Sequence, residues 1–142
     1  MSDFTKARYT AIISDLHLTE EEPVNLEYPL WKKYKTREFF FDRDFAEFLK
    51  TIEMKAQGEK IELILNGDIF DFDSVSSIPN DPPFRISWLE SKRGLHPQEE
   101  KSIYKFHRIH DGHREWFMAL SNFLRKGHRV VFVIGNHDLE LH

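Results

Sequence analysis

Three short apolar segments limit the folds that this chain can adopt. They cover residues 9–14 (YTAIIS), 61–66 (IELILN) and 129–134 (RVVFVI). The first and third are continuous runs rich in β-branched residues, which is typical of strands covered on both faces of a sheet. The second contains Glu62, and this charge favours a position nearer the edge of the sheet.

Helical periodicity fills the two intervals between these segments. Apolar residues at three- and four-residue steps form one helix face in the first interval, at Phe41, Phe45, Phe48, Leu49, Ile52 and Ala56. We expect Gly58 to end this helix. The same spacing continues from Ile103 to Leu124, with Gly127 as the stop and Gly112 as a weak point. The alternation predicts an α/β fold, a parallel-strand sheet with right-handed crossover helices.

Two loops are too long and too rich in proline to be minimal connections. They cover residues 19–37 and 73–97, and both follow the carboxyl end of a predicted strand. We predict one domain over residues 1–142 that carries these two insertions. Their aromatic residues Trp31, Phe84 and Trp88 favour local packing, with a cap over a substrate as the alternative.

Composition excludes several classes of protein. The net charge of −4 argues against duplex nucleic acid as a partner. The absence of cysteine excludes disulfides and thiolate metal sites. No apolar stretch approaches the roughly 20 residues of a transmembrane helix, so we predict a cytoplasmic protein. His107, His110 and His113 follow one another at three-residue steps, which favours a polar helix flank over a metal site.

Each predicted strand ends in a cluster of metal-type ligands: SDLH at 14–17, NGDIFD at 66–71 and GNHD at 135–138. Parallel strands bring their carboxyl ends to one edge of a sheet, so we expect these clusters to form one pocket. Asp15 and His17 would point to the same side of an extended strand. Asp68 follows a glycine that permits a sharp turn, and Asn136 follows another. Oxygen ligands mixed with imidazole suit manganese, iron or zinc better than magnesium.

Turn chemistry is the alternative for each cluster, because Asp, Asn and Gly are common after strands. It would explain any one cluster but poorly explains three at successive strand ends. Asp71 is evenly balanced between a loop cap and a site residue.

Together the three motifs resemble the calcineurin-like metallophosphoesterase superfamily, over about residues 9–138 with both insertions unmatched. The resemblance implies the first half of an αββα sandwich and a metal-dependent phosphoester hydrolase with two divalent ions. By this resemblance Asp15 and His17 would bind the first ion and Asp68 would bridge both. Asn136 would bind the second ion.

The resemblance also implies the chemistry of the site. Activated hydroxide would attack the phosphorus of a phosphomonoester, phosphodiester or pyrophosphate in line. His137 would face the substrate phosphate, Asp138 would orient His137, and Asp71 would support the ligands from outside. The substrate class is a phosphorylated small molecule or a lipid-linked nucleotide.

The superfamily takes further ligands from a later histidine and a Gly-His-x-His motif, which the chain lacks after Asp138. The second ion would keep only Asp68 and Asn136, so we expect its site to be weak or empty. We therefore expect a truncated half-domain that is inactive alone, with exposed sheet surface that permits self-association. The alternative is a non-catalytic protein-interaction module that retains the fold. The acidic balance disfavours a nuclease.

Overall fold

The computed structural model describes residues 7–20 and 41–141 as a three-stranded sheet with helices. The strands are β1 (Tyr9–Ile13), β2 (Ile61–Asn66) and β3 (Arg129–Val133). The helices are α1 (Asp42–Ala56), α2 (Glu90–Arg93), α3 (Glu99–Gly112) and α4 (Arg114–Arg125), followed by the 3₁₀ turn η1 (Leu139–Leu141). The predicted α/β fold class is confirmed.

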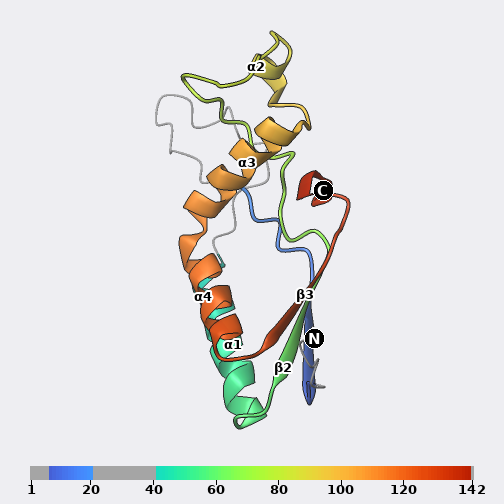
Figure 1. The fold of residues 1–142 in the computed structure, drawn as a ribbon, viewed down its shortest axis with the longest axis vertical. Helices are drawn as coiled ribbons and strands as arrows, with labels where there is room; N and C mark the ends of the chain where they lie inside the picture. The colour runs from blue at the N-terminus through green and yellow to red at the C-terminus, as the bar shows by residue number, and fades with distance from the viewer. Residues whose placement is uncertain (1–6, 21–40, 142) are drawn as a thin grey trace.

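All the strand pairings are parallel, and the sheet order is β1-β2-β3 (Figure 1). The prediction that the second strand lies nearer an edge is wrong, because β2 is the central strand. Glu62 is accommodated there by a partner in the neighbouring strand, since Arg129 Nε lies 3.1 Å from Glu62 Oε2. This cross-strand ion pair explains how the charged Glu62 can lie in the central strand of the sheet.

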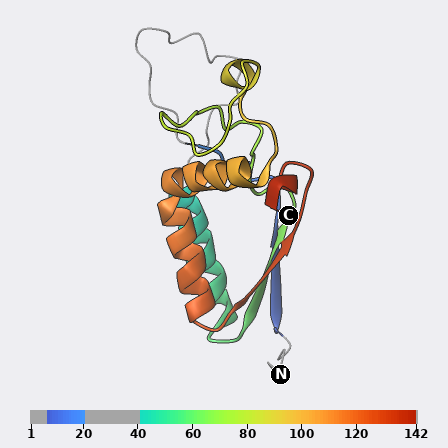
Figure 2. The ribbon, with the colours of Figure 1, turned by 45° about the horizontal axis from the view of Figure 1, so that its top comes forward.

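Helices α1 and α4 lie side by side on one face of the sheet, whereas α3 runs across the end of the sheet (Figure 2). Leu63 and Leu65 of β2 are fully buried beneath them. On the opposite face Ile12 is 64% exposed, and no described element covers it. The expectation that the first and third strands are covered on both faces is therefore wrong for the described part of the chain.

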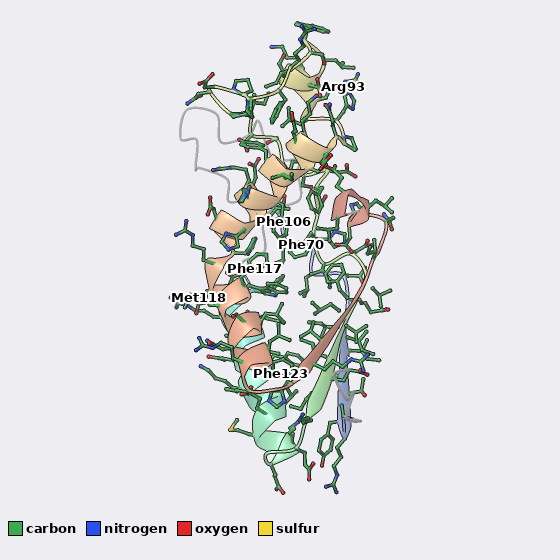
Figure 3. All side chains as sticks on the ribbon, in the orientation of Figure 1. Phe70, Arg93, Phe106, Phe117, Met118 and Phe123 are labelled. Carbon is green, nitrogen blue, oxygen red and sulfur yellow. The ribbon has the colours of Figure 1, made fainter. Side chains whose placement is uncertain are left out.

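Phe70 is the centre of the core between the sheet and the helices (Figure 3). Its ring stacks on Phe117 of α4, with centroids 5.9 Å apart, and on Phe132 of β3, at 5.8 Å. It also meets Phe106 and Trp116 edge-on. Since Phe70 stands between Asp68 and Asp71, this packing anchors the loop that carries two of the predicted site residues.

The single helix predicted here is two helices, α3 and α4, that meet at His113, directly after the predicted weak point Gly112, and turn sharply (Figure 2). His113 is buried, contrary to the expected polar flank, and its Nδ1 lies 2.7 Å from Asp42 Oδ1. Asp42 Oδ2 accepts a hydrogen bond from the Trp116 backbone N–H, 3.2 Å away. Asp42 of α1 thus caps the first turn of α4, where helical N–H groups lack internal partners.

Residues 73–97, the predicted second insertion, contain α2 and are held by buried carboxylates. Glu90 binds Lys101 Nζ at 2.6 Å, and this bond with those from Ser87 holds the pKa of Glu90 well below its usual value. Phe84 packs edge-on against Tyr104 of α3, whereas Trp88 is exposed. The local packing predicted for these aromatic residues is therefore seen for Phe84 and not for Trp88. Trp31 and residues 21–37 of the other insertion lie outside the described residues.

Glu20, the last described residue before the gap, joins the two insertions. Its Oε1 accepts hydrogen bonds from the backbone N–H groups of Ser76 and Ser77, at 2.7 and 2.8 Å. Burial raises the pKa of Glu20, but the hydrogen bonds from Ser77 and Ser76 offset this and leave the pKa below its ordinary value. The segment after β1 is therefore fixed to the segment after β2.

We expect Asp42→Ala to lower the free energy of unfolding by about 2–3 kcal/mol, because it removes a buried charged acceptor from His113 and Trp116. Urea denaturation followed by circular dichroism measures the change. Asp44→Ala, an exposed carboxylate in the same helical turn, is the control and should cost far less. Equal losses for the two variants would contradict the capping role.

Candidate metal centre

Backbone pairing continues past the ends of the strands and brings the three ligand clusters together. The Asp15 N–H donates to Gly67 O at 3.1 Å, and the His17 N–H donates to Asp68 O at 3.0 Å. On the other side of β2, the Gly67 N–H donates to Val133 O at 2.9 Å. The sheet therefore sets the separation of the loops before any side chain is considered.

Asp15, His17 and Asp68 form one group of potential ligands. One ligand atom from each lies within 4.8 Å of the other two. All three residues have left-handed backbone conformations, with φ of 56°, 49° and 52°. Asp15 and His17 thus come together in left-handed backbone beyond the end of β1, and not in the extended strand that the sequence predicted. Left-handed conformations at residues other than glycine are strained and are typical of functional sites.

Asp68 also packs against the loop after β3. Its Oδ1 accepts a hydrogen bond from the His137 backbone N–H at 3.0 Å. A Cβ atom on Gly135 would overlap the backbone N and the carboxylate of Asp68, so only glycine fits at this position. The loop carrying Asp68 therefore sits directly on the loop carrying Asn136, which is exposed beside Gly135.

His17, Asp71 and His137 form a second group, whose ligand atoms also lie within 4.8 Å of one another. The rings of His17 and His137 meet edge-on, with centroids 4.8 Å apart. His137 Nδ1 lies 3.5 Å from Asp71 Oδ1 and 4.0 Å from Asp73 Oδ2. Asp71 therefore lies beside His137, the residue that the family resemblance paired with Asp138.

Asp138 is fully buried and bonds to backbone groups. Its Oδ1 accepts from the Phe70 N–H at 2.7 Å, and its Oδ2 accepts from Ile69 at 3.3 Å and Gly135 at 3.0 Å. These bonds tie the loop after β2 to the loop after β3. In this structure the Asp138 side chain supports the two ligand loops through their backbone N–H groups. Its effect on His137 is therefore indirect.

Ser74 is a supporting residue that the sequence argument missed. Its backbone N–H donates to Asp71 Oδ1 at 3.1 Å, and its hydroxyl donates to Asp71 Oδ2 at 2.6 Å. Both bonds span three residues, and an Asp followed by Ser at that spacing is a common turn pattern that could have revealed them. Ser74 therefore fixes the orientation of the Asp71 carboxylate.

The first group of ligands fits a divalent cation. Two carboxylates and one imidazole provide a donor set used for manganese, iron or zinc, and the three donors are already close together. The ligand role predicted for Asn136 rests on its neighbourhood alone and stays a prediction.

Carboxylates and imidazoles gather at the carboxyl edge of this parallel sheet. The fold and the site are therefore those of an α/β protein with candidate metal ligands at the ends of its strands. The family model for calcineurin-like phosphoesterases matches residues 9–142, and the chain belongs to this family. The comparisons with curated proteins and with solved structures gave no match. The family is one of metal-dependent phosphoester hydrolases, which confirms the resemblance seen in the three motifs.

One negative finding concerns the helices. Within residues 7–20 and 41–141, none of them is both long enough and apolar enough to span a membrane.

We expect Gly135→Ala to weaken Mn²⁺ binding at least about tenfold and to destabilise the fold by about 1–3 kcal/mol, because the added methyl displaces Asp68. Isothermal titration calorimetry and urea denaturation measure the two effects. Gly127→Ala is the control, since Gly127 has φ of +85° but open space around it. It should lose stability and keep its Mn²⁺ affinity. Unchanged Mn²⁺ binding by Gly135→Ala would contradict the proposed packing.

Proposed function

We propose that the chain binds a divalent cation through Asp15, His17 and Asp68 and that this centre hydrolyses phosphoesters. The observation that carries the proposal is the convergence of these three donors within 4.8 Å of one another at the carboxyl edge of the sheet. Membership of the calcineurin-like phosphoesterase family supports the reaction class. When bound, a divalent cation lowers the pKa of coordinated water and screens the charge of the phosphate.

We assign His137 the role of acting on the substrate phosphate. It stands beside His17 on the edge that carries the ligands, and it is partly exposed. An imidazole there can donate to phosphate oxygens or protonate a departing alcohol. We assign Asp71 the role of positioning the His137 ring, since its carboxylate faces His137 Nδ1 and is itself held by Ser74.

A second cation would have few protein donors. Of the predicted ligands, Asp68 and Asn136 remain for it, whereas ions of this class take about five or six donors. We therefore propose that the second ion binds weakly and that this chain turns over slowly on its own. The substrate is a phosphorylated small molecule or a lipid-linked nucleotide. The preference for manganese and the cytoplasmic location also stay predictions.

The first experiment does not depend on turnover. We expect the wild-type chain to bind Mn²⁺, and inorganic phosphate to bind only when Mn²⁺ is present. Asp68→Asn should weaken Mn²⁺ binding at least about tenfold and remove phosphate binding, because it removes a ligand while preserving shape. Calorimetric titration measures both. Asp81→Asn, an exposed carboxylate in the 73–97 insertion, is the matched control. Equal Mn²⁺ affinity in both variants would refute the centre.

The second experiment tests the ligand count. We expect hydrolysis of bis(p-nitrophenyl) phosphate with saturating Mn²⁺ to stay close to the rate without protein, because only two of the predicted ligands, Asp68 and Asn136, remain for the second ion. The visible absorbance of the released p-nitrophenolate follows the reaction. Clear turnover that disappears in Asp68→Asn would show that the second ion finds sufficient donors, contrary to our expectation.

One observation favours a non-catalytic interaction module as the second candidate. Ile12, Ile64 and Val131 lie side by side across the uncovered face of the sheet, and Ile12 is largely exposed. An uncovered apolar row suits protein association, including self-association. The phosphate titration separates the two candidates, since an interaction module has no need of Mn²⁺-dependent phosphate binding.

A further inference from the structure

We propose that the surface around α2 binds an anionic lipid bilayer. We call this surface the α2 tip and define it by five exposed side chains, those of Arg85, Trp88, Leu89, Lys92 and Arg93. It lies at one end of the longest axis of the described structure, away from the sheet (Figure 1). Attachment through the α2 tip does not require the proposed metal centre.

The apolar part of the α2 tip is a pair of neighbouring side chains that solvent reaches. Trp88 is 76% exposed, more than any other large apolar side chain of the described residues, and Leu89 is 40% exposed. The Leu89 carbonyl is satisfied within the turn, since it accepts hydrogen bonds from the Lys92 and Arg93 N–H groups at 3.1 and 3.0 Å. Tryptophan is enriched at membrane–water interfaces, where its amphipathic ring lies at the level of the headgroups. The Trp88 ring therefore suits an interface of this kind.

The charged part of the α2 tip is entirely basic. Between residues 82 and 98 the exposed charged residues are Arg85, Lys92 and Arg93, and the one carboxylate, Glu90, is buried. Within the part of the chain that the structure describes, none of these three cations lies in an ion pair. Three uncompensated cations in a chain of net charge −4 favour an anionic partner.

Glu90 fixes the α2 tip to the rest of the fold. Its Oε1 accepts a hydrogen bond from Lys101 Nζ of α3 at 2.6 Å, and its Oε2 accepts one from the Ser87 backbone N–H at 2.8 Å. Hydrogen bonds to charged groups are about twice as strong as neutral ones. Trp88 and Lys92 are therefore presented to solvent from a turn with a buried anchor, and they can reach a membrane surface without rearrangement of the fold.

An exposed indole combined with cations favours a bilayer over other anionic partners. Anionic headgroups attract the cations, and the interface accepts an apolar ring without a matching pocket. A protein partner would have to supply that pocket, and a small projecting tip offers little area for a stable interface. Duplex nucleic acid would reward a broad basic face and would gain nothing from Leu89. An anionic bilayer uses both parts of the α2 tip.

Vesicle sedimentation with the whole chain at low ionic strength tests the proposal. The vesicles contain either phosphatidylcholine alone or equal parts of phosphatidylcholine and phosphatidylserine. We expect binding to the mixed vesicles, weaker binding to the neutral vesicles, and release by added salt. Trp88→Ala and the double variant Lys92→Gln/Arg93→Gln should each weaken binding to the mixed vesicles at least about fivefold.

Matched control variants lie in the second half of α1, toward the end of the described structure opposite α2 (Figure 1). Met54→Ala removes an apolar side chain that is 71% exposed, and Lys50→Gln/Lys55→Gln removes two exposed cations. Both should bind the mixed vesicles as the wild type does. The circular dichroism spectrum of every variant should match that of the wild type.

Absence of binding to the mixed vesicles, or equal binding to the neutral vesicles, would overturn the proposal. Equal losses in the control variants would overturn it as well, because attachment would then not involve the α2 tip. Analytical ultracentrifugation without lipid separates the remaining alternative. If it shows a dimer that Trp88→Ala dissociates, and vesicle binding is unchanged in that variant, the α2 tip joins two copies of the chain and the lipid assignment fails.

Discussion

The buried carboxylate of Asp138 is the interaction on which the edge of this sheet depends. It accepts hydrogen bonds from three backbone N–H groups, two in the loop after β2 and one in the loop after β3. In the opposite direction, Asp68 Oδ1 accepts a hydrogen bond from the His137 backbone N–H. Each loop thus sends a charged acceptor to the backbone of the other, and such bonds are about twice as strong as neutral ones. The ligand loops are therefore positioned by the protein alone.

This reciprocal bonding explains why two groups of metal-type ligands occupy so small a region. Phe70 anchors the middle loop in the core, and the residues on either side of it, Asp68 and Asp71, are drawn to different neighbours. Asp68 joins Asp15, whereas Asp71 joins His137, and His17 lies within reach of both. One short segment after β2 thus builds two donor sets of different chemistry.

Much of this arrangement could be predicted from the sequence, because the signals were local. Apolar runs and helical periodicity indicated the strands and crossover helices, and parallel topology then implied that Asp15 and Asp68 would meet. Properties set by distant partners could not be predicted. Arg129 is the partner that accommodates Glu62 in the central strand, and Asp42 is the partner that holds His113 where two helices meet after Gly112, the predicted weak point. Asp138 likewise bonds to backbone atoms about 70 residues away, for which local sequence carries no signal.

The left-handed backbone at Asp15, His17 and Asp68 has a consequence for how this chain can change. Glycine would suit each of these conformations better, since other residues there cost roughly 1–2 kcal/mol. At Asp15 and His17, glycine would therefore relieve backbone strain and delete a donor in the same step, whereas at Asp68 it would also remove the acceptor for the His137 N–H. A protein that served only as a binding surface would have no need of metal-type side chains in this strained backbone. This chain nevertheless keeps side chains with lone pairs at all three positions.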